Sequence, residues 1–198
     1  MKLVVSNQLG YQFKVTLRDV KPTVWRRVIV PAELTLHDLH KIIQTTMGWT
    51  NSHHHNFTKD KVHYSAPESG DDDEWMSTGE SDSRKIILKD LISVESDKLL
   101  YSYDFGDSWE HDIILEKVIP LKPDVFYPVC TDGKMACPPE DCGGAPGYED
   151  LCKVLKNPKH PEYPDLIDWL GDVFDPAYFD PDEVNEFLRE PDFGTFSD

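Results

Sequence analysis

Hydrophobic and polar residues alternate along the first part of the chain, in the pattern of half-buried β-strands. Every second residue of Tyr11–Arg18 is apolar, and Val24–Val30 repeats the alternation with Arg26 interleaved among valines. The intervening Lys21-Pro22 is typical of a turn. We therefore expect these two strands to pair as an antiparallel hairpin.

The spacing of apolar residues then changes from two to the helical period. Thr35 is suited to cap a helix, Asp38 stands at the capping-box position three residues later, and Gly48 is suited to end the helix. Alternation returns in Asn51–Lys59, and Val62–Tyr64 is expected to be a short partner strand.

A second hairpin is expected in Leu99–Leu115, turning at Gly106-Asp107. A two-residue turn would place Asp104 opposite Trp109, and a four-residue turn would place it opposite His111. Both registers put a set of residues on one buried face: Leu100, Asp104, Trp109, His111, Ile113 and Leu115. Buried polar groups need partners, so we expect Asp104 and His111 to pair.

The rest of the chain is expected to form loops and short helices. Residues 65–83 are acidic and rich in Ser and Gly, which predicts a mobile loop. A loop is expected at Cys130–Gly147, followed by three helices: Tyr148–Leu155, Asp165–Leu170 and one from Asp180 to about Arg189. Together the elements predict a single α+β domain over residues 1–198, with its core at about 11–190. Its mostly antiparallel sheet would carry a crossing helix, an αβ roll with a β-grasp-like order of elements, and an acidic helical segment at 160–198.

Charge narrows the classes of partner. The net charge of −17 argues against nonspecific binding to duplex DNA. Residues 162–198 hold twelve acidic residues against one arginine, so we expect a basic protein partner there. Residues 14–41 hold six basic and three acidic residues, which leaves direct nucleic-acid contact as a weaker alternative. No membrane-spanning stretch or secretory signal is evident, and four cysteines in this length favour reduced thiols in the cytoplasm.

Several side chains are of types that bind metals. Three cysteines fall in one loop, and three histidines lie on the predicted strands; the candidate ligands are Cys130, Cys137, Cys142, His53, His55 and His111. These would hold zinc either through converging imidazoles oriented by Asp104 or as a Cys₃His set. His111 and Asp104 are also the candidate catalytic residues. A purely structural role for these residues, and a Cys137 or Cys142 nucleophile paired with His111, remain open alternatives.

The chain resembles one family, on five segments: WRRVIVP, LTLHDLHKIIQTTMGW, HHHNF, YSYDFGDSWEHDI and YPVC…ACPPEDCGG…GYEDL. Together these are similar to the plasmid pRiA4b ORF-3-like domain, over about residues 11–188. The resemblance implies a single α+β domain and an association with plasmids and other mobile elements, and it implies no established activity. The family strand reads His-Leu-His-x-Phe, and here His54 stands at the Leu position.

Two functions follow as hypotheses. The first is a non-catalytic cytoplasmic binding module, stabilised by zinc and linked to mobile elements, whose acidic C-terminal segment meets a basic protein. The second is a metal-dependent hydrolase or nuclease that uses the His/Asp/Cys site and needs an open coordination position for water.

Overall fold

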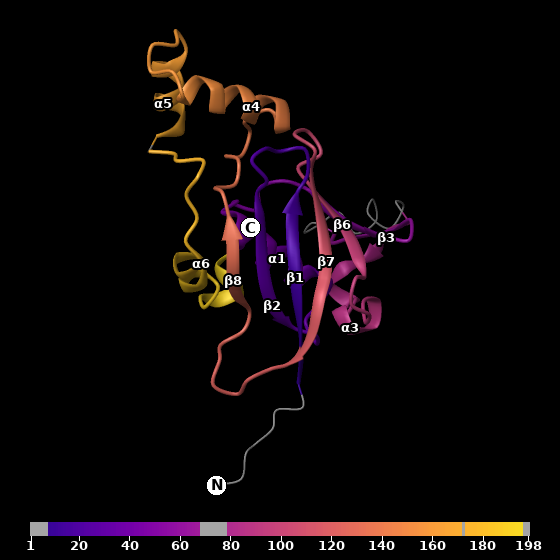
Figure 1. Ribbon diagram of the computed structural model, residues 1–198. Helices are drawn as coiled ribbons and strands as arrows, with labels where there is room; N and C mark the ends of the chain where they lie inside the picture. Colours follow the sequence, from indigo (N-terminus) through magenta and orange to yellow (C-terminus); the bar gives the residue numbers. More distant parts are fainter. Residues whose placement is uncertain (1–7, 68–78, 172, 196–198) are drawn as a thin grey trace.

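The computed structural model describes residues 8–67, 79–171 and 173–195. Within them the chain forms a mostly antiparallel sheet of eight strands and several helices (Figure 1), which confirms the expected α+β class. The strands are β1 (Leu9–Leu17), β2 (Trp25–Pro31), β3 (His55–Lys59), β4 (Val62–Ser65), β5 (Ser81–Asp82), β6 (Lys98–Tyr103), β7 (Trp109–Pro120) and β8 (Val129–Lys134). The helices are α1 (Leu36–Met47), α3 (Leu88–Leu91), α4 (Gly144–Leu155), α5 (Tyr163–Leu170) and α6 (Pro181–Phe187), with short 3₁₀ turns η1 (Ser83–Lys85) and η2 (Pro191–Gly194).

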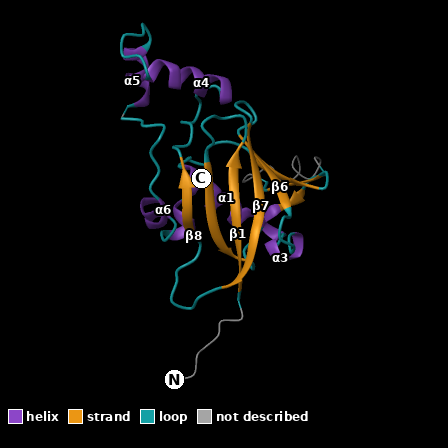
Figure 2. Ribbon diagram, in the orientation of Figure 1, coloured by secondary structure: helices purple, strands orange, loops and turns teal. Residues whose placement is uncertain are grey.

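The strand order is β5-β4-β3-β6-β7-β1-β2-β8, and the neighbours are antiparallel except for β4 with β5. The long strands β1 and β7 lie at the centre of the sheet, and α1 crosses behind them (Figure 2). Part of the predicted acidic loop at 65–83 belongs to this sheet, because Ser65 ends β4 and Ser81–Asp82 forms β5; residues 68–78 lie outside the described residues.

The predicted caps of α1 are confirmed. The Thr35 hydroxyl accepts a hydrogen bond from the Asp38 amide, the Asp38 carboxylate accepts one from the Thr35 amide at 2.8 Å, and Gly48 ends the helix with φ of 83°. One side of α1 packs into the core through Leu36, Leu39, Ile42 and Ile43, all fully buried. The end of α1 leads directly into the segment that carries His53.

Most of the basic side chains at residues 14–41 are engaged in contacts within the fold. Arg18 pairs with Glu110 and Asp112 at 2.8 and 2.6 Å, and Arg27 pairs with Glu116 at 2.7 Å. Two further cations of this stretch are also engaged, since Arg26 is buried and Lys41 pairs with Asp192. Little of this charge is therefore left free to contact a phosphate backbone.

The register expected for the second hairpin is wrong. Tyr103 pairs with Trp109 and Tyr101 with His111, so the loop spans residues 104–108, longer than either predicted turn. The face of β7 that carries Trp109, His111 and Ile113 is buried as expected. The longer loop, however, turns the side chains of Leu99, Tyr101 and Tyr103 into the core in place of Leu100.

The C-terminal third departs from the expected loop at Cys130–Gly147. Its first residues form the edge strand β8, and α4 begins at Gly144. Helices α4 and α5 lie beyond the ends of the strands, whereas α6 packs beside β8 (Figure 1). Among the described residues, no helix has both the length and the apolar character to cross a bilayer.

Candidate metal centre

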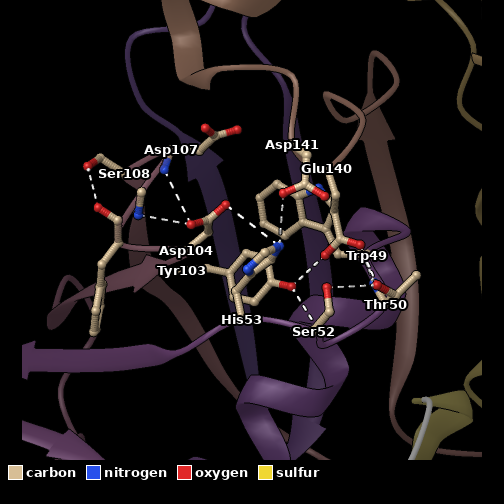
Figure 3. Close-up of polar contacts among 12 residues, drawn as sticks. Trp49, Thr50, Ser52, His53, Tyr103, Asp104, Asp107, Ser108, Glu140 and Asp141 are labelled. Atoms are coloured by element: carbon tan, nitrogen blue, oxygen red, sulfur yellow. Dashed lines mark hydrogen bonds and ion pairs between the residues drawn. The ribbon is translucent and has the colours of Figure 1, made fainter. Parts of the chain in front are cut away.

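Three loops meet at one end of the sheet and bring together His53, Asp104 and Asp141 (Figure 3). Each offers one ligand atom, and these three atoms lie within 4.8 Å of one another. No other three His, Cys, Asp or Glu side chains do so in the part of the chain that the structure describes. We call these three residues the HDD group.

His53 comes from the segment between α1 and β3. Its ring contacts Tyr103 edge-on, with 5.8 Å between ring centroids. Its Nε2 atom is buried and makes no hydrogen bond of acceptable geometry. The same atom lies 3.3 Å from Oδ1 of Asp141 and 3.8 Å from Oδ2 of Asp104. This nitrogen is therefore aimed between two carboxylates.

Asp104 occupies the first position of the β6–β7 loop, with φ of 53°. Its Oδ1 atom accepts hydrogen bonds from the amides of Gly106 and Asp107 at 2.9 and 3.3 Å, as Asp commonly does in turns. Asp104 is only 8% exposed. The turn thus satisfies one oxygen of the carboxylate and leaves Oδ2 directed at His53.

Asp141 comes from the loop between β8 and α4 and also has a positive φ, of 57°. Its side chain is 72% exposed, so the HDD group is open to solvent on this side. The adjacent Glu140 holds the loop in place, because its carboxylate accepts hydrogen bonds from the hydroxyls of Tyr103 and Thr50. Trp49 also binds this loop, through its indole N–H to the Pro138 carbonyl at 3.0 Å.

The spacing of the HDD group fits a metal ion. Ligand atoms about 2.1 Å from a shared ion lie roughly 3.0–3.5 Å apart at octahedral or tetrahedral angles. The distances from His53 Nε2 to the two carboxylates, 3.3 and 3.8 Å, are close to this range. One imidazole and two carboxylates suit Zn²⁺, Mn²⁺ or Fe²⁺, and a cation would offset the negative charge. Three protein ligands leave coordination positions free.

His55 is not part of the HDD group. It lies on β3 and stacks on His40 of α1, with 3.4 Å between ring centroids and an interplanar angle of 5°. Burial lowers the pKa of His55 to about 3, with His37 adding to the shift. His40 is held by the hydroxyl of Tyr101 at 2.8 Å and by Asn51 at 2.7 Å. This cluster links the helix to the sheet.

The predicted Asp104–His111 pair is absent from the described contacts. His111 is fully buried between Trp49 and Tyr101, and the Tyr101 carbonyl lies 3.4 Å from its Nδ1 atom. The hairpin register explains this absence. Tyr101 lies opposite His111 on the neighbouring strand, where the four-residue turn would have placed Asp104. Burial lowers the pKa of His111 to about 3.

The three loop cysteines do not join the histidines in a group with metal-binding spacing. Cys130 lies on β8, Cys137 is buried, and Cys142 is half-buried. Burial raises the pKa of the Cys130 thiol to about 11 and that of Cys142 to about 12, and it raises the pKa of Cys137 further. These thiols are neutral at pH 7, unlike a nucleophilic cysteine.

Sequence reasoning found two of the three members of the HDD group. It did not propose Asp141 as a ligand, and it did not single out Tyr103 or Thr50. The available signal was the Glu140-Asp141 pair in a loop dense in Pro and Gly, which is the kind of rigid loop that presents functional groups.

The comparisons with known proteins agree with this architecture. The family model described as "Plasmid pRiA4b ORF-3-like protein" matches residues 9–183, which include the whole HDD group. "Uncharacterized protein y4hQ" of Sinorhizobium fredii (strain NBRC 101917 / NGR234) is 39% identical over 167 residues, covering 81% of this chain and 80% of that protein. The crystal structure of a protein of unknown function, MM3350 from Methanosarcina mazei Go1, matches with a TM-score of 0.80 and 40% identity, covering 89% of this chain and 98% of that one.

Proposed function

The chain belongs to the plasmid pRiA4b ORF-3-like family, whose matched relatives are uncharacterised, and from its geometry we propose that it is a binding module built around a divalent metal ion. His53, Asp104 and Asp141 would be the ligands. The observation that carries the proposal is the Nε2 atom of His53, which is buried without a hydrogen bond and faces two carboxylate oxygens. A buried nitrogen without a hydrogen bond is costly, and a metal ion would satisfy it.

The ligand set supports a functional ion rather than a purely structural one. Structural zinc sites are usually closed by four protein ligands, most of them cysteine or histidine. Here the ligands are one imidazole and two carboxylates, and the Asp141 side chain is largely exposed. A bound ion would keep positions open toward solvent, where a ligand group of a partner or substrate can coordinate.

Metal-dependent hydrolysis is the second candidate, and the same open side favours it. An ion with free positions can bind water and lower its pKa, which makes a nucleophile available at neutral pH. The net charge of −17 and the paired arginines of the sheet favour a small substrate over a nucleic acid. This narrows the hydrolase-or-nuclease hypothesis to a hydrolase.

The first experiment is metal titration of tag-free protein by calorimetry with Zn²⁺ and Mn²⁺, paired with elemental mass spectrometry. We expect about one ion per chain and at least tenfold weaker binding in His53→Ala, Asp104→Asn and Asp141→Asn. Asp107→Asn is the matched control, since Asp107 lies in the same loop as Asp104 and its acceptor oxygen for the Gly143 amide is kept. Wild-type affinity in all three variants would overturn the proposal.

Two further measurements separate the alternatives. Cys142→Ser is expected to leave metal binding unchanged. Loss of metal binding in this variant would indicate that a cysteine thiol is among the ligands. Turnover of chromogenic phosphate and carboxylate esters, measured with each metal and with EDTA, tests the hydrolase. Hydrolysis that needs metal and disappears in Asp104→Asn supports the hydrolase. Metal binding without turnover supports the non-catalytic binding module.

A cytoplasmic location is part of the same proposal. Four free cysteines, with no disulfide among the described residues, are compatible with the cytoplasm. The link to mobile elements is supported by the family description alone.

A further inference from the structure

Four side chains form a closed ring of hydrogen bonds that joins α1, β6 and the segment after α1. The backbone amide of Asn51 donates to Oε1 of Gln44 at 3.1 Å, and Nε2 of Gln44 donates to the Tyr101 hydroxyl at 2.8 Å. This hydroxyl lies 2.8 Å from Nδ1 of His40, and Oδ1 of Asn51 lies 2.7 Å from its Nε2. His40, Gln44 and Tyr101 are at most 1% exposed. A buried network in which every group has a partner holds its members in one arrangement.

The positions of the protons in this ring follow from one backbone amide. The Asn51 N–H can only donate, so it faces Oε1 of Gln44 and leaves Nε2 of Gln44 to donate to Tyr101. The Tyr101 hydroxyl then directs its single proton to Nδ1 of His40. His40 carries its own proton on Nε2 and donates it to Oδ1 of Asn51. Burial keeps the imidazole neutral, because it lowers the pKa of His40 well below its usual value.

His40 contacts the chain on both sides of His53. On one side it is hydrogen-bonded to Asn51, which adopts a positive φ of 60°. On the other side its ring stacks on His55, with 3.4 Å between centroids and an interplanar angle of 5°. One imidazole of α1 therefore holds the residues two before and two after the metal ligand.

The same segment also supports a second ligand of the HDD group. The backbone amide of Asp104 donates a hydrogen bond to the His54 carbonyl at 2.9 Å. A shift of this segment would therefore move His53 and Asp104 together.

We propose that His40 is a positioning residue of the metal centre, which holds the His53 imidazole in place through Asn51 and His55. His40 binds no metal itself, because both of its ring nitrogens are occupied within the hydrogen-bonded ring. This inference rests on the proposed function, in which the HDD group binds the ion. It gives the metal centre a supporting shell on α1, outside the loops that carry the ligands.

The test combines Zn²⁺ and Mn²⁺ affinity, measured by calorimetry, with deuterium uptake of residues 49–55 in EDTA. His40→Leu removes both hydrogen bonds, so we expect about tenfold weaker metal binding and about tenfold faster exchange in this segment. His40→Gln can still donate to Asn51 through its amide, and both values should stay within about threefold of the wild type. Tyr101→Phe breaks the ring with little change of shape and should act in the same direction as His40→Leu.

Thr46→Val is the matched control. Thr46 is another buried polar residue of α1, and its hydroxyl donates to the Ile43 carbonyl at 3.1 Å, outside the ring. Metal affinity and exchange should change less than about twofold in this variant, and urea unfolding in EDTA records the stability of each protein. Equal weakening in Thr46→Val and His40→Leu would assign the effect to a general loss of stability and overturn the proposal. Equal weakening in His40→Gln and His40→Leu would also overturn it.

The exchange measurement needs no metal, so it separates this inference from the proposed function. If the wild type binds no metal and His40→Leu still exchanges faster, the metal centre is refuted, whereas the role of His40 in holding His53 is supported. If the wild type binds metal and His40→Leu keeps wild-type affinity and exchange, the positioning role is overturned and the metal centre stands.

Discussion

The hydroxyl of Tyr103 donates a hydrogen bond to Oε1 of Glu140 at 2.5 Å, and this contact ties the end of β6 to the loop that carries Asp141 (Figure 3). The same hydroxyl accepts a hydrogen bond from the Ser52 amide at 3.1 Å, next to His53. The Tyr103 ring also stacks on Trp49, with 4.9 Å between centroids. One side chain therefore positions all three loops of the HDD group.

Tyr103→Phe should weaken metal binding without touching a ligand. Burial and the Glu140 carboxylate raise the pKa of Tyr103, so the hydroxyl stays a donor at neutral pH. Its removal leaves Glu140 with one partner fewer and loosens the loop. We expect about tenfold lower affinity for Zn²⁺ or Mn²⁺ by calorimetry, and a loss of about 1 kcal/mol of stability. Tyr178→Phe, on an exposed tyrosine, is the control. Unchanged affinity in Tyr103→Phe would show that Glu140 holds the loop without it.

Local signals in the sequence predicted α1 and the paired strands β1 and β2 well, because caps and alternation act over a few neighbouring residues. The Thr35–Asp38 capping box and the Gly48 stop are examples. The β6–β7 hairpin was predicted, but its register was not. Register depends on loop length, and the positive φ of Asp104 and Ser108 that allows the longer loop leaves no mark in the alternation.

Prediction of the site is limited in the same way, because its residues are far apart in the sequence. His53 and Asp104 could be selected by residue type, since both are of types that bind metals and both lie on or near predicted strands. Their meeting with Asp141 depends on how the loop before α4 folds back, which is settled by contacts such as Trp49 with Pro138 and Gly143 with Asp107. Hydrophobic periodicity predicts which face of a strand or helix a side chain lies on, but it does not predict which loops meet in space.

His111 should make the protein less stable in mild acid. It is fully buried, and burial lowers its pKa from 6.5 to about 3. Between these values the unfolded chain binds a proton that the folded chain does not, so stability falls as pH decreases from about 6.5 toward 3. The contribution of one such group is up to about 1.4 kcal/mol per pH unit. Urea unfolding of His111→Leu across this range should show a slope smaller by up to one proton. The exposed His63→Gln should keep the wild-type slope. An identical slope in His111→Leu would assign the acid sensitivity to other groups.

Asn185 should be needed to protect the free edge of β8. Its side-chain oxygen accepts a hydrogen bond from the Cys130 amide at 2.7 Å, and its amide group donates one to the Cys130 carbonyl at 2.8 Å. Through these two bonds α6 imitates a neighbouring strand and covers an edge that could otherwise pair with another chain. Asn185→Ala leaves both backbone groups without these partners, so we expect a loss of about 2 kcal/mol in urea unfolding and more light scattering on heating. Asn157→Ala, at an exposed position, should cost less than about 0.5 kcal/mol. Equal losses in the two variants would rule out the edge role.

Arg26 should contribute more to stability than its neighbour Arg27, although both are arginines on β2. Arg26 is 2% exposed and donates hydrogen bonds to the carbonyls of Thr46 at 2.8 Å and Lys134 at 3.1 Å. Its guanidinium lies 3.9 Å from the centroid of the Phe179 ring. Thr46 is in the last turn of α1, where a cation also favours the helix dipole.

The pair therefore supports a matched comparison by urea unfolding. Arg26→Lys cannot reproduce the forked contacts, and its compact ammonium is costlier to bury, so we expect a loss of about 3 kcal/mol. Arg27 lies on the solvent face and pairs with Glu116 and Asp132, so Arg27→Lys should cost less than about 1 kcal/mol. Because Arg26 anchors the end of α1 just before Trp49 and His53, Arg26→Lys should also weaken metal binding, whereas Arg27→Lys should not. Similar losses of stability in both variants would mean that the contacts of the buried Arg26 guanidinium contribute no more to stability than the surface ion pairs of Arg27.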